Sequence, residues 1–436
     1  IERLRPDAAG KLDLIIHNAG QLVTCASPGG PKRGAAMQDV GIIGDGAVAI
    51  KEGFFTAVGT SDEILEKYKA AELIDAAGRA VVPGFVDPHT HIVYAGDRLS
   101  EFELKIKGAE YLDILAAGGG IISTVRNTRA TTEEQLIDAA LGRLDKMLAC
   151  GTTVCEIKTG YGLDTETELK MLRVIEALDK RHSIKIVPTF LAAHAVPPEF
   201  KEDVDGYVEL ICREMLPQAW NWYLGSHFVA EGTPFFADIF CERNAFDVGH
   251  AAQIFDLAAS LGFRLKAHVD QFTNLGGSRL GVEQEAVSID HLDAISDEEI
   301  ALLAASRTVG VVIPTENFNG GKMQFAPARK MIDAGCAVAL TTDYNPGSAP
   351  CPSQPMAMAI ACRYQKLLPA EAVNAATINA AYAIGLGNTH GSIEVGKRAD
   401  LNILDSTDWR MHVYEFGGNL VAETLAEGRP AVRNKG

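Results

Sequence analysis

The sequence lacks paired cysteine motifs and long apolar runs. None of its eight cysteines forms a C-x-x-C pair, so a zinc ribbon or a dithiol redox site is not expected, and reduced thiols are the simplest interpretation. No segment approaches the roughly 18 uninterrupted apolar residues of a membrane span, and the stretch from Ile1 to Asp7 lacks the apolar core of a signal peptide. These absences predict a cytoplasmic protein with no membrane partner.

The chain also has few basic residues relative to acidic ones. Lysine and arginine number 40 against 57 aspartate and glutamate residues, which gives a formal net charge of −17. Such a charge repels nucleic acid and anionic membranes, so a polyanionic partner is not expected. A small anionic substrate remains compatible with it, because one or two buried arginines set the local field whatever the net charge.

What is present is the pattern of a large α/β protein. The chain has 436 residues, 47% of them hydrophobic, which suits one α/β barrel with an accessory domain, or two domains. After Pro83 buried strands alternate with helical stretches, which is the rhythm of parallel βαβ units. Eight strands are predicted, over residues 81–86, 152–157, 184–191, 237–240, 264–267, 286–289, 308–313 and 337–342.

The two ends of the chain have β character instead. From Leu12 to about Val82 short apolar runs alternate with glycine-rich turns, and β character returns from His390 onward. We therefore expect an α/β fold: a (β/α)8 TIM-like barrel over residues 83–389, and a small β-sandwich domain formed by residues 1–82 together with 390–436.

Polar residues that carry chemistry follow the predicted strands. In a barrel of this kind active-site residues lie at the carboxyl ends of the strands. Five of the 11 histidines fall at such ends, and so do an aspartate after the eighth strand and a tyrosine after the second. The histidines are His89, His91, His194, His268 and His291; the other two residues are Asp343 and Tyr161.

The pair His89 and His91 is the strongest local signal. Alternation along an extended strand places both imidazoles on one side of the backbone. His268 and Asp343 complete a set of three nitrogens and one oxygen, which suits one divalent ion, Zn2+ or Fe2+, with a position left for water. Taken singly, each of these residues also has a structural interpretation: a polar loop histidine, a core histidine, or a helix N-cap at Asp343.

The remaining candidates concern substrate and protons. His291 and His194 are candidates for proton transfer or for polarising a carbonyl, and the alternative is support of the metal ligands. Arg98 and Tyr161 are candidate carboxylate binders through their hydrogen-bond donors. The Asn345-Pro346-Gly347-Ser348 segment offers an amide and backbone N–H groups beside Asp343, and the alternative is an ordinary turn.

With these residues in view, the chain resembles the amidohydrolase superfamily and, within it, the imidazolonepropionase family. H-x-H alone identifies only the superfamily. Longer motifs carry the narrower resemblance: Pro-Gly-Phe-Val-Asp-Pro-His-Thr-His (83–91), Ala-Gly-Asp-Arg (95–98), Lys-Thr-Gly-Tyr-Gly-Leu (158–163) and Asp-Tyr-Asn-Pro-Gly-Ser (343–348).

The resemblance implies hydrolytic ring opening of 4-imidazolone-5-propanoate to N-formimidoyl-L-glutamate in histidine degradation, by a homodimer. It places one metal ion on His89, His91, His268 and Asp343. Our own hypothesis is that Asp343, His291 and His268 are the catalytic groups. The resemblance places the substrate contacts on Arg98, Tyr161, His194, Asn345, Gly347 and Ser348, and we add Gln271 as a further candidate contact.

Two positions depart from the family pattern. Gln271 stands where an acidic residue is common, and residues 313–321 replace an aromatic-rich segment. These departures keep two rival hydrolytic functions open: opening of a related propanoate-bearing ring of hydantoin or thiohydantoin type, and deamination of a heterocycle. A binding module that had lost catalysis would show a broken ligand set, and no ligand is missing.

Overall fold

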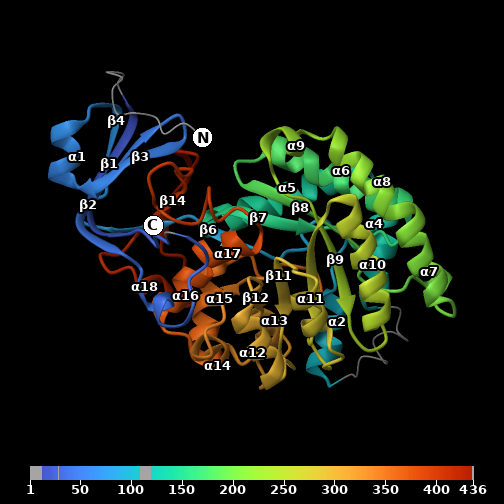
Figure 1. The fold of residues 1–436 in the computed structure, drawn as a ribbon. Helices are drawn as coiled ribbons and strands as arrows, with labels where there is room; N and C mark the ends of the chain where they lie inside the picture. The colour runs from blue at the N-terminus through green and yellow to red at the C-terminus, as the bar shows by residue number, and fades with distance from the viewer. Residues whose placement is uncertain (1–11, 28, 109–118, 435–436) are drawn as a thin grey trace.

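The computed structural model describes residues 12–27, 29–108 and 119–434, and places a parallel barrel beside a separate, smaller sheet (Figure 1). The barrel strands pair in sequence order, each parallel to the next. They are β6 (Phe85–Asp87), β7 (Thr152–Lys158), β8 (Lys185–Ala193), β9 (Phe236–Cys241), β10 (Arg264–Val269), β11 (Ser288–His291), β12 (Val309–Val312) and β13 (Val338–Leu340). The predicted barrel is confirmed.

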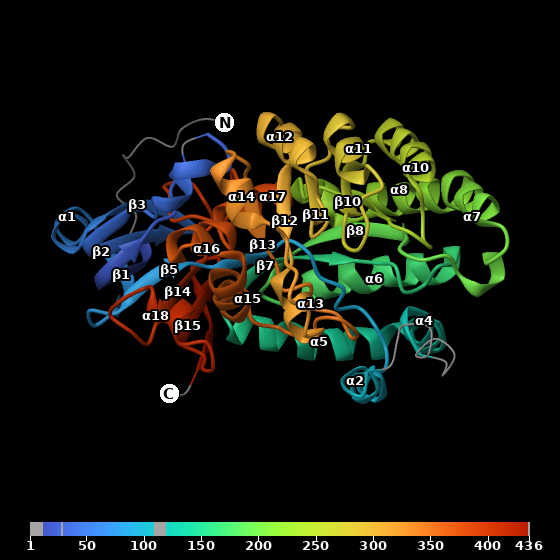
Figure 2. The ribbon, with the colours of Figure 1, turned by 90° about the horizontal axis from the view of Figure 1, so that it is seen from below.

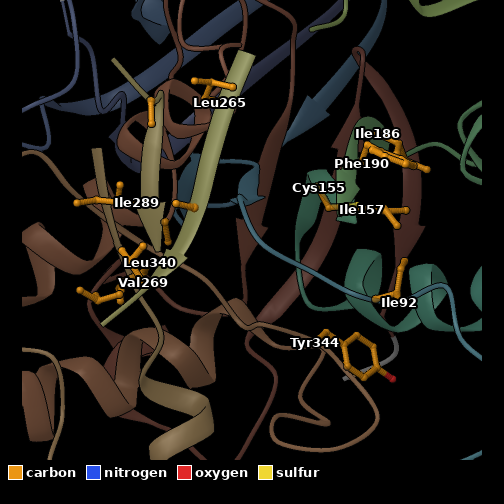
Figure 3. Packing of buried hydrophobic residues seen from close by; sticks show 14 of the residues in the cluster. Ile92, Cys155, Ile157, Ile186, Phe190, Leu265, Val269, Ile289, Leu340 and Tyr344 are labelled. Atoms are coloured by element: carbon orange, nitrogen blue, oxygen red, sulfur yellow. The ribbon is translucent and has the colours of Figure 1, made fainter. Parts of the chain in front are cut away.

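Strand alternation decides which side chains enter the barrel. On β7, Cys155 and Ile157 join the hydrophobic layer that also contains residues of the outer helices, whereas Val154 belongs to a second cluster. Glu156 shares the face of Val154, because successive residues point to opposite faces. Figure 3 shows part of the outer layer around Ile157 and Ile289. Glu156 and Lys158 of β7 therefore lie inside the barrel.

Helices cover the outside of the barrel (Figure 2). Several begin at hydrogen-bonding caps: Thr132, Asp247 and Ser296 form capping boxes. The long helices are α5 (Glu133–Ala149), α6 (Thr165–Arg181), α8 (Leu216–Gly225), α10 (Val248–Leu261), α12 (Asp297–Ala305) and α4 (Ile121–Ala130). The shorter ones are α2 (Leu99–Ile106), α7 (Val204–Leu210), α9 (His227–Glu231), α11 (Gly277–Glu283), α13 (Pro314–Asn319), α14 (Ala328–Asp333), α15 (Gln354–Ile360), α16 (Pro369–Ala375), α17 (Ile378–Ala383) and α18 (Met411–Tyr414).

Side chains join the first and last barrel strands. Among the described residues no backbone ladder pairs β6 with β13. Instead, the buried Asp87 carboxylate accepts hydrogen bonds from the hydroxyls of Thr341 and Thr342. Gln354 Nε2 donates to Val86 O at 2.9 Å and to Leu340 O at 3.4 Å. These contacts hold the residues after β6 beside those after β13.

The smaller sheet combines both ends of the chain. Its strands β1 (Leu12–Val23), β2 (Ile42–Lys51), β3 (Phe54–Thr60), β4 (Ala70–Asp75) and β5 (Ala80–Pro83) join β14 (Leu401–Leu404), β15 (Val421–Ala426) and β16 (Arg429–Arg433). Helix α1 (Ser61–Lys67) follows β3. β5 pairs with β1 on one side and β14 on the other, so the strands form one continuous sheet. Leu14, Phe55 and Leu401 share its core.

The prediction of one barrel strand over residues 81–86 is wrong in detail. Ala80–Pro83 belongs to the small sheet and Phe85–Asp87 to the barrel, with Gly84 between them. A Cβ at position 84 would lie 2.2 Å from Thr153 Oγ1, so the chain changes sheets at a residue without a side chain. A continuous apolar run does not reveal such a change. The exact domain bounds, 1–82 with 390–436 and 83–389, stay a prediction.

The described residues contain no helix of the length and apolarity that a membrane crossing requires.

Candidate metal centre and active site

Three histidine side chains converge at one end of the barrel. His89 and His91 follow β6, and His268 faces inward from β10. His89 Nε2 lies 3.2 Å from His91 Nε2, which in turn lies 3.4 Å from His268 Nε2. All three residues are buried. The first and fifth barrel strands thus bring the Nε2 atoms of the three predicted ligands within 3.4 Å of a neighbouring one.

Asp343 reaches the same place from the segment after β13. Its Oδ1 lies 3.6 Å from the Nε2 atoms of both His89 and His91. Asp343 has φ of 48°, a left-handed conformation that is uncommon for a residue with a side chain. Burial raises the pKa of this carboxyl to about 8. All four predicted ligands therefore meet at one point.

The donor set fits a divalent cation. His89 Nδ1 donates to Asp290 at 2.7 Å and His268 Nδ1 donates to Asp238 at 3.1 Å, so their Nε2 atoms carry lone pairs. Burial lowers the pKa of His89 well below 6.5 and that of His268 to about 3, which keeps both rings neutral. Facing lone pairs repel one another unless a cation lies among them. Neutral imidazoles with carboxylate-bound Nδ1 groups are the form that metal ions require.

A buried charged layer supports these histidines from inside the barrel. Lys158 Nζ contacts Asp238 at 2.7 Å and Glu156 at 2.8 Å, and Lys266 Nζ lies 3.4 Å from Glu156. Lys266 also donates to Pro88 O at 2.9 Å. The side chains of Lys158, Lys266, Glu156, Asp238 and Asp290 are fully buried. Because buried charges are costly unless paired, this layer fixes the two carboxylates that orient His89 and His268.

His291 stands next to the centre in a strained conformation. Its φ is 85° and that of Leu292 is 70°. The ring centroid lies 5.3 Å from that of His268 and 5.5 Å from that of His89. Burial alone would lower the pKa of His291, but the nearby charges of Glu316 and Asp343 outweigh burial and raise it. Glu316 and Asp343 thus act on the pKa of His291 against the effect of its burial.

Tyr161 and His194 form an aromatic wall next to His91. The His194 ring stacks on that of His91, with centroids 4.8 Å apart and 13° between planes, and Tyr161 lies 5.4 Å from His194. His194 Nδ1 donates to Gly160 O at 3.0 Å. Burial lowers the pKa of His194 to about 4, so its ring is neutral. Both predicted substrate contacts thus lie at the centre.

Arg98 and the loop after Asp343 lie against each other. Arg98 Nε pairs with the buried Glu101 at 2.8 Å, and a Cβ at Gly347 would lie 2.1 Å from Arg98 Nη1. Asn345 Oδ1 accepts from the N–H groups of Gly347 and Ser348, both at 2.8 Å. The amide nitrogen of Asn345 donates to Asp343 Oδ2 at 2.9 Å. Asn345 thus builds the loop that presents Gly347 and Ser348.

The two departures from the family pattern contact each other. Gln271 Nε2 donates to Glu316 Oε2 at 2.8 Å, and Glu316 lies in helix α13, within residues 313–321. Glu316 Oε2 also lies 3.3 Å from His291 Nδ1, a close ion pair without hydrogen-bond alignment. Gln271 therefore joins the site through Glu316.

Comparison with known proteins places the chain in a family. The amidohydrolase family model matches residues 80–430. The curated imidazolonepropionase of Chloroflexus aggregans is 53% identical over 97% of this chain and 99% of its own length. Those of Herpetosiphon aurantiacus and Bacillus velezensis are 50% and 42% identical, over 97% and 98% of this chain and 98% of their own lengths. This chain belongs to the imidazolonepropionase family. It is accordingly a metal-dependent hydrolase.

Solved structures share the architecture of this imidazolonepropionase-family chain at low sequence identity. Guanine deaminase of E. coli has a TM-score of 0.71 at 15% identity, covering 98% of this chain and all 100% of that one. Adenosine deaminase of Xanthomonas campestris, solved with bound zinc, has a TM-score of 0.69 at 19% identity over 96% and 93% of the two chains. At such identities the likeness concerns the fold alone.

The sequence interpretation of this imidazolonepropionase-family site missed its supporting residues. Asp238, Asp290 and Lys266 orient or balance the predicted ligands, and Glu101 and Glu316 hold Arg98 and Gln271. A signal for the first group exists, because charged residues inside otherwise apolar strands are unusual. Glu316 follows the predicted strand over residues 308–313, where the barrel rule expects site residues, but no role is assigned to it from the sequence; Glu101 lies in helix α2 and carries no such signal.

Proposed function

We propose that this chain hydrolyses 4-imidazolone-5-propanoate to N-formimidoyl-L-glutamate, a step of histidine degradation. One observation supports the proposal above the others: a cluster of neutral imidazoles and one carboxylate lies beside a loop that packs on the Arg98 guanidinium. The first element suits attack on a ring carbonyl, and the second suits a carboxylate tail. The imidazolonepropionase names of the relatives agree with both.

The proposed metal ligands are His89, His91, His268 and Asp343, for one ion of Zn2+ or Fe2+. Three nitrogens and one oxygen suit either metal. When bound, the ion supplies Lewis acidity toward the ring carbonyl and the attacking water. The carboxylates Asp290 and Asp238 hold the two histidine tautomers that such an ion needs.

The chain's own residues then handle protons. Asp343 accepts the proton of the attacking water and returns one to the ring nitrogen when the C–N bond breaks. Its Oδ1 lies 3.6 Å from the Nε2 atoms of His89 and His91, so the carboxylate is close to the place from which the water attacks and can take up and return a proton. His291 donates a hydrogen bond to the carbonyl oxygen as negative charge develops there. His268 would contribute to catalysis as one of the metal ligands.

The remaining predicted residues bind the substrate. Arg98 binds the propanoate through charge-assisted hydrogen bonds, while Tyr161 and His194 line the ring. Gly347 and Ser348 offer backbone and hydroxyl groups from the loop that Asn345 holds. Gln271 contributes an amide whose orientation is set by its contact with Glu316.

A panel assay with metal analysis tests this proposal. The chain is expected to contain about one Zn or Fe ion and to turn over imidazolone propanoate faster than hydantoin propanoate, its thiohydantoin analogue, or an aminated heterocycle. The hydantoin-type rings are the second candidate, because the Gln271–Glu316 contact lies where the sequence departs from the family pattern. Faster turnover of another ring would replace the proposed substrate.

Three broader properties stay predictions: a homodimer, a cytoplasmic location, and the division into residues 83–389 and the paired end segments. Light scattering of the purified chain tests the first.

A further inference from the structure

The Glu316 carboxylate connects three different parts of the barrel mouth. Its Oε2 accepts from Gln271 Nε2 at 2.8 Å, and its Oε1 accepts from Lys322 Nζ at 2.9 Å. His291 Nδ1 lies 3.3 Å from Oε2. Glu316 is only 4% exposed, so water does not compete for these contacts. One side chain thus connects the segment after β10, the last residue of β11 and the segment after β12.

The charge of Glu316 decides how the Gln271 amide points. Burial alone would raise the pKa of Glu316, but His291 and Lys322 outweigh burial and lower the pKa to about 2. An ionised carboxylate only accepts hydrogen bonds. Gln271 must therefore turn its NH2 group toward Glu316, and its carbonyl oxygen points away from Glu316. Position 271 then offers a hydrogen-bond acceptor at the mouth of the barrel.

The same carboxylate restrains His291. Glu316 Oε2 lies 3.3 Å from His291 Nδ1, and both side chains are buried. The backbone at His291 and Leu292 is left-handed, with φ of 85° and 70°, a conformation that persists only when the surroundings impose it. The His291 ring also lies against His89 and His268. The orientation of this ring is therefore set jointly by Glu316 and the histidine cluster.

We propose that Glu316 is a positioning residue for the ring-opening reaction, holding the His291 imidazole and the Gln271 amide in the orientations that receive the substrate ring. Gln271 accepts a hydrogen bond from a ring N–H, and His291 donates to the ring carbonyl oxygen. This arrangement of acceptor and donor suits a cyclic amide with an N–H next to its reacting carbonyl. The inference rests on the proposed function.

Reciprocal substitution tests the proposal. Gln271→Glu places two carboxylates in contact, and Glu316→Gln removes the charge that orients its partners. Each is expected to lower kcat/KM for imidazolone propanoate at least tenfold, mainly through kcat, because Arg98 is untouched. The double variant restores one carboxylate and one amide with their positions exchanged, and is expected to recover at least fivefold over Gln271→Glu. Such non-additivity identifies a direct interaction.

Lys322→Met is the matched control. The substitution removes the third partner of Glu316, since the side chain of Lys322, which is 38% exposed, contacts Glu316 from the surface. The contacts of Glu316 with Gln271 and His291 remain. We expect less than a threefold change in kcat/KM. Metal content is expected to stay the same in all four variants, which separates loss of positioning from loss of the metal.

Two outcomes overturn the inference. One is a kcat/KM of Glu316→Gln equal to that of the wild type. The other is a double variant whose fold-loss in kcat/KM equals the product of the fold-losses of the two single variants. A second readout does not depend on turnover. In 15N-histidine spectra the His291 Nδ1 resonance is expected to move in Glu316→Gln and stay in Lys322→Met, and an unmoved resonance in the former also rejects the proposal. If the wild-type chain does not turn over imidazolone propanoate but the His291 Nδ1 resonance moves in Glu316→Gln, the proposed substrate is rejected. The contact between Glu316 and His291 is then still supported.

Discussion

At the scale of single residues, Gly347 has no room for a side chain. It lies on the loop that Asn345 organises, and the Arg98 guanidinium occupies the space that a side chain at position 347 would take. Glu101 fixes the other side of Arg98 through a 2.8 Å contact with Nε. The position of the guanidinium is therefore determined between a carboxylate and a glycine.

We predict that Gly347→Ala weakens substrate binding. The added Cβ would lie 2.1 Å from Arg98 Nη1, so the guanidinium must move. Loss of one charge-assisted hydrogen bond costs about 1.5–3 kcal/mol, which corresponds to a rise in KM of roughly 10- to 100-fold with a smaller change in kcat. Gly29→Ala, where an added Cβ meets nothing within 4 Å, is the control. An unchanged KM would contradict the assignment of Arg98.

Among the elements, helix α6 controls the loop that carries Tyr161. Glu168, in its first turn, is fully buried and accepts backbone hydrogen bonds from Gly160 at 3.0 Å, Gly162 at 2.7 Å and Leu163 at 2.9 Å. Leu163 has φ of 56°. The loop takes its shape from a carboxylate on the following helix, and that shape places Tyr161 beside the histidines.

We predict that Glu168→Gln moves this loop. The new NH2 group would face backbone N–H groups that need an acceptor, which costs about 1–3 kcal/mol per unsatisfied group. The expected result is a lower free energy of unfolding and a KM raised about tenfold, with metal content unchanged. Glu166→Gln, an exposed acidic residue in the same helical turn, is the matched control. Equal kinetics in the two variants would reject the role of Glu168.

The sequence predicted the elements better than the contacts between them. The eight strands and the meeting of His89, His268 and Asp343 follow from one rule, that the carboxyl ends of barrel strands share a face. The split at Gly84 and the Gln271–Glu316 contact do not follow, because each depends on packing between segments that are distant in sequence. The roles of the predicted site residues stay predictions.

At the scale of the whole molecule, the predicted ligands come from the first, fifth and last barrel strands. A bound ion would therefore connect segments some 250 residues apart in the sequence, and anything that binds only the folded state stabilises it. A chelator is expected to lower Tm by several degrees, as followed by calorimetry. His89→Ala with His91→Ala is expected to contain no metal, to lose activity, and to show no change in Tm with chelator. A chelator-sensitive Tm in that double variant would place the ion elsewhere.

Asp400 makes stability depend on pH at the junction of the two sheets. Its Oδ1 accepts from Glu427 N at 2.8 Å, and its backbone oxygen accepts from Gly84 N at 3.0 Å. Burial raises the pKa of this carboxyl from 3.8 to about 7. The folded state therefore binds a proton that the unfolded chain releases at lower pH, so stability is fully present below pH 4 and is lost as pH rises through 7.

Asp400→Asn is expected to remove this dependence. The amide oxygen can still accept from Glu427 N, and no charge is buried. The free energy of unfolding of the variant relative to wild type is expected to rise between pH 4 and pH 8, by at most about 4 kcal/mol. Urea unfolding at several pH values measures it. A difference that stays constant with pH would contradict the raised pKa.

The position of β5 between β1 and β14 has a consequence for biosynthesis. β14 leaves the ribosome roughly 320 residues after β5, which at about 5–20 residues per second is an interval of tens of seconds. During that interval the edge of β5 that later pairs with β14 has no partner strand, and all eight barrel strands are translated within it. The terminal sheet is therefore completed last, and a nascent chain halted between residues 340 and 401 has all eight barrel strands but an open sheet edge at β5.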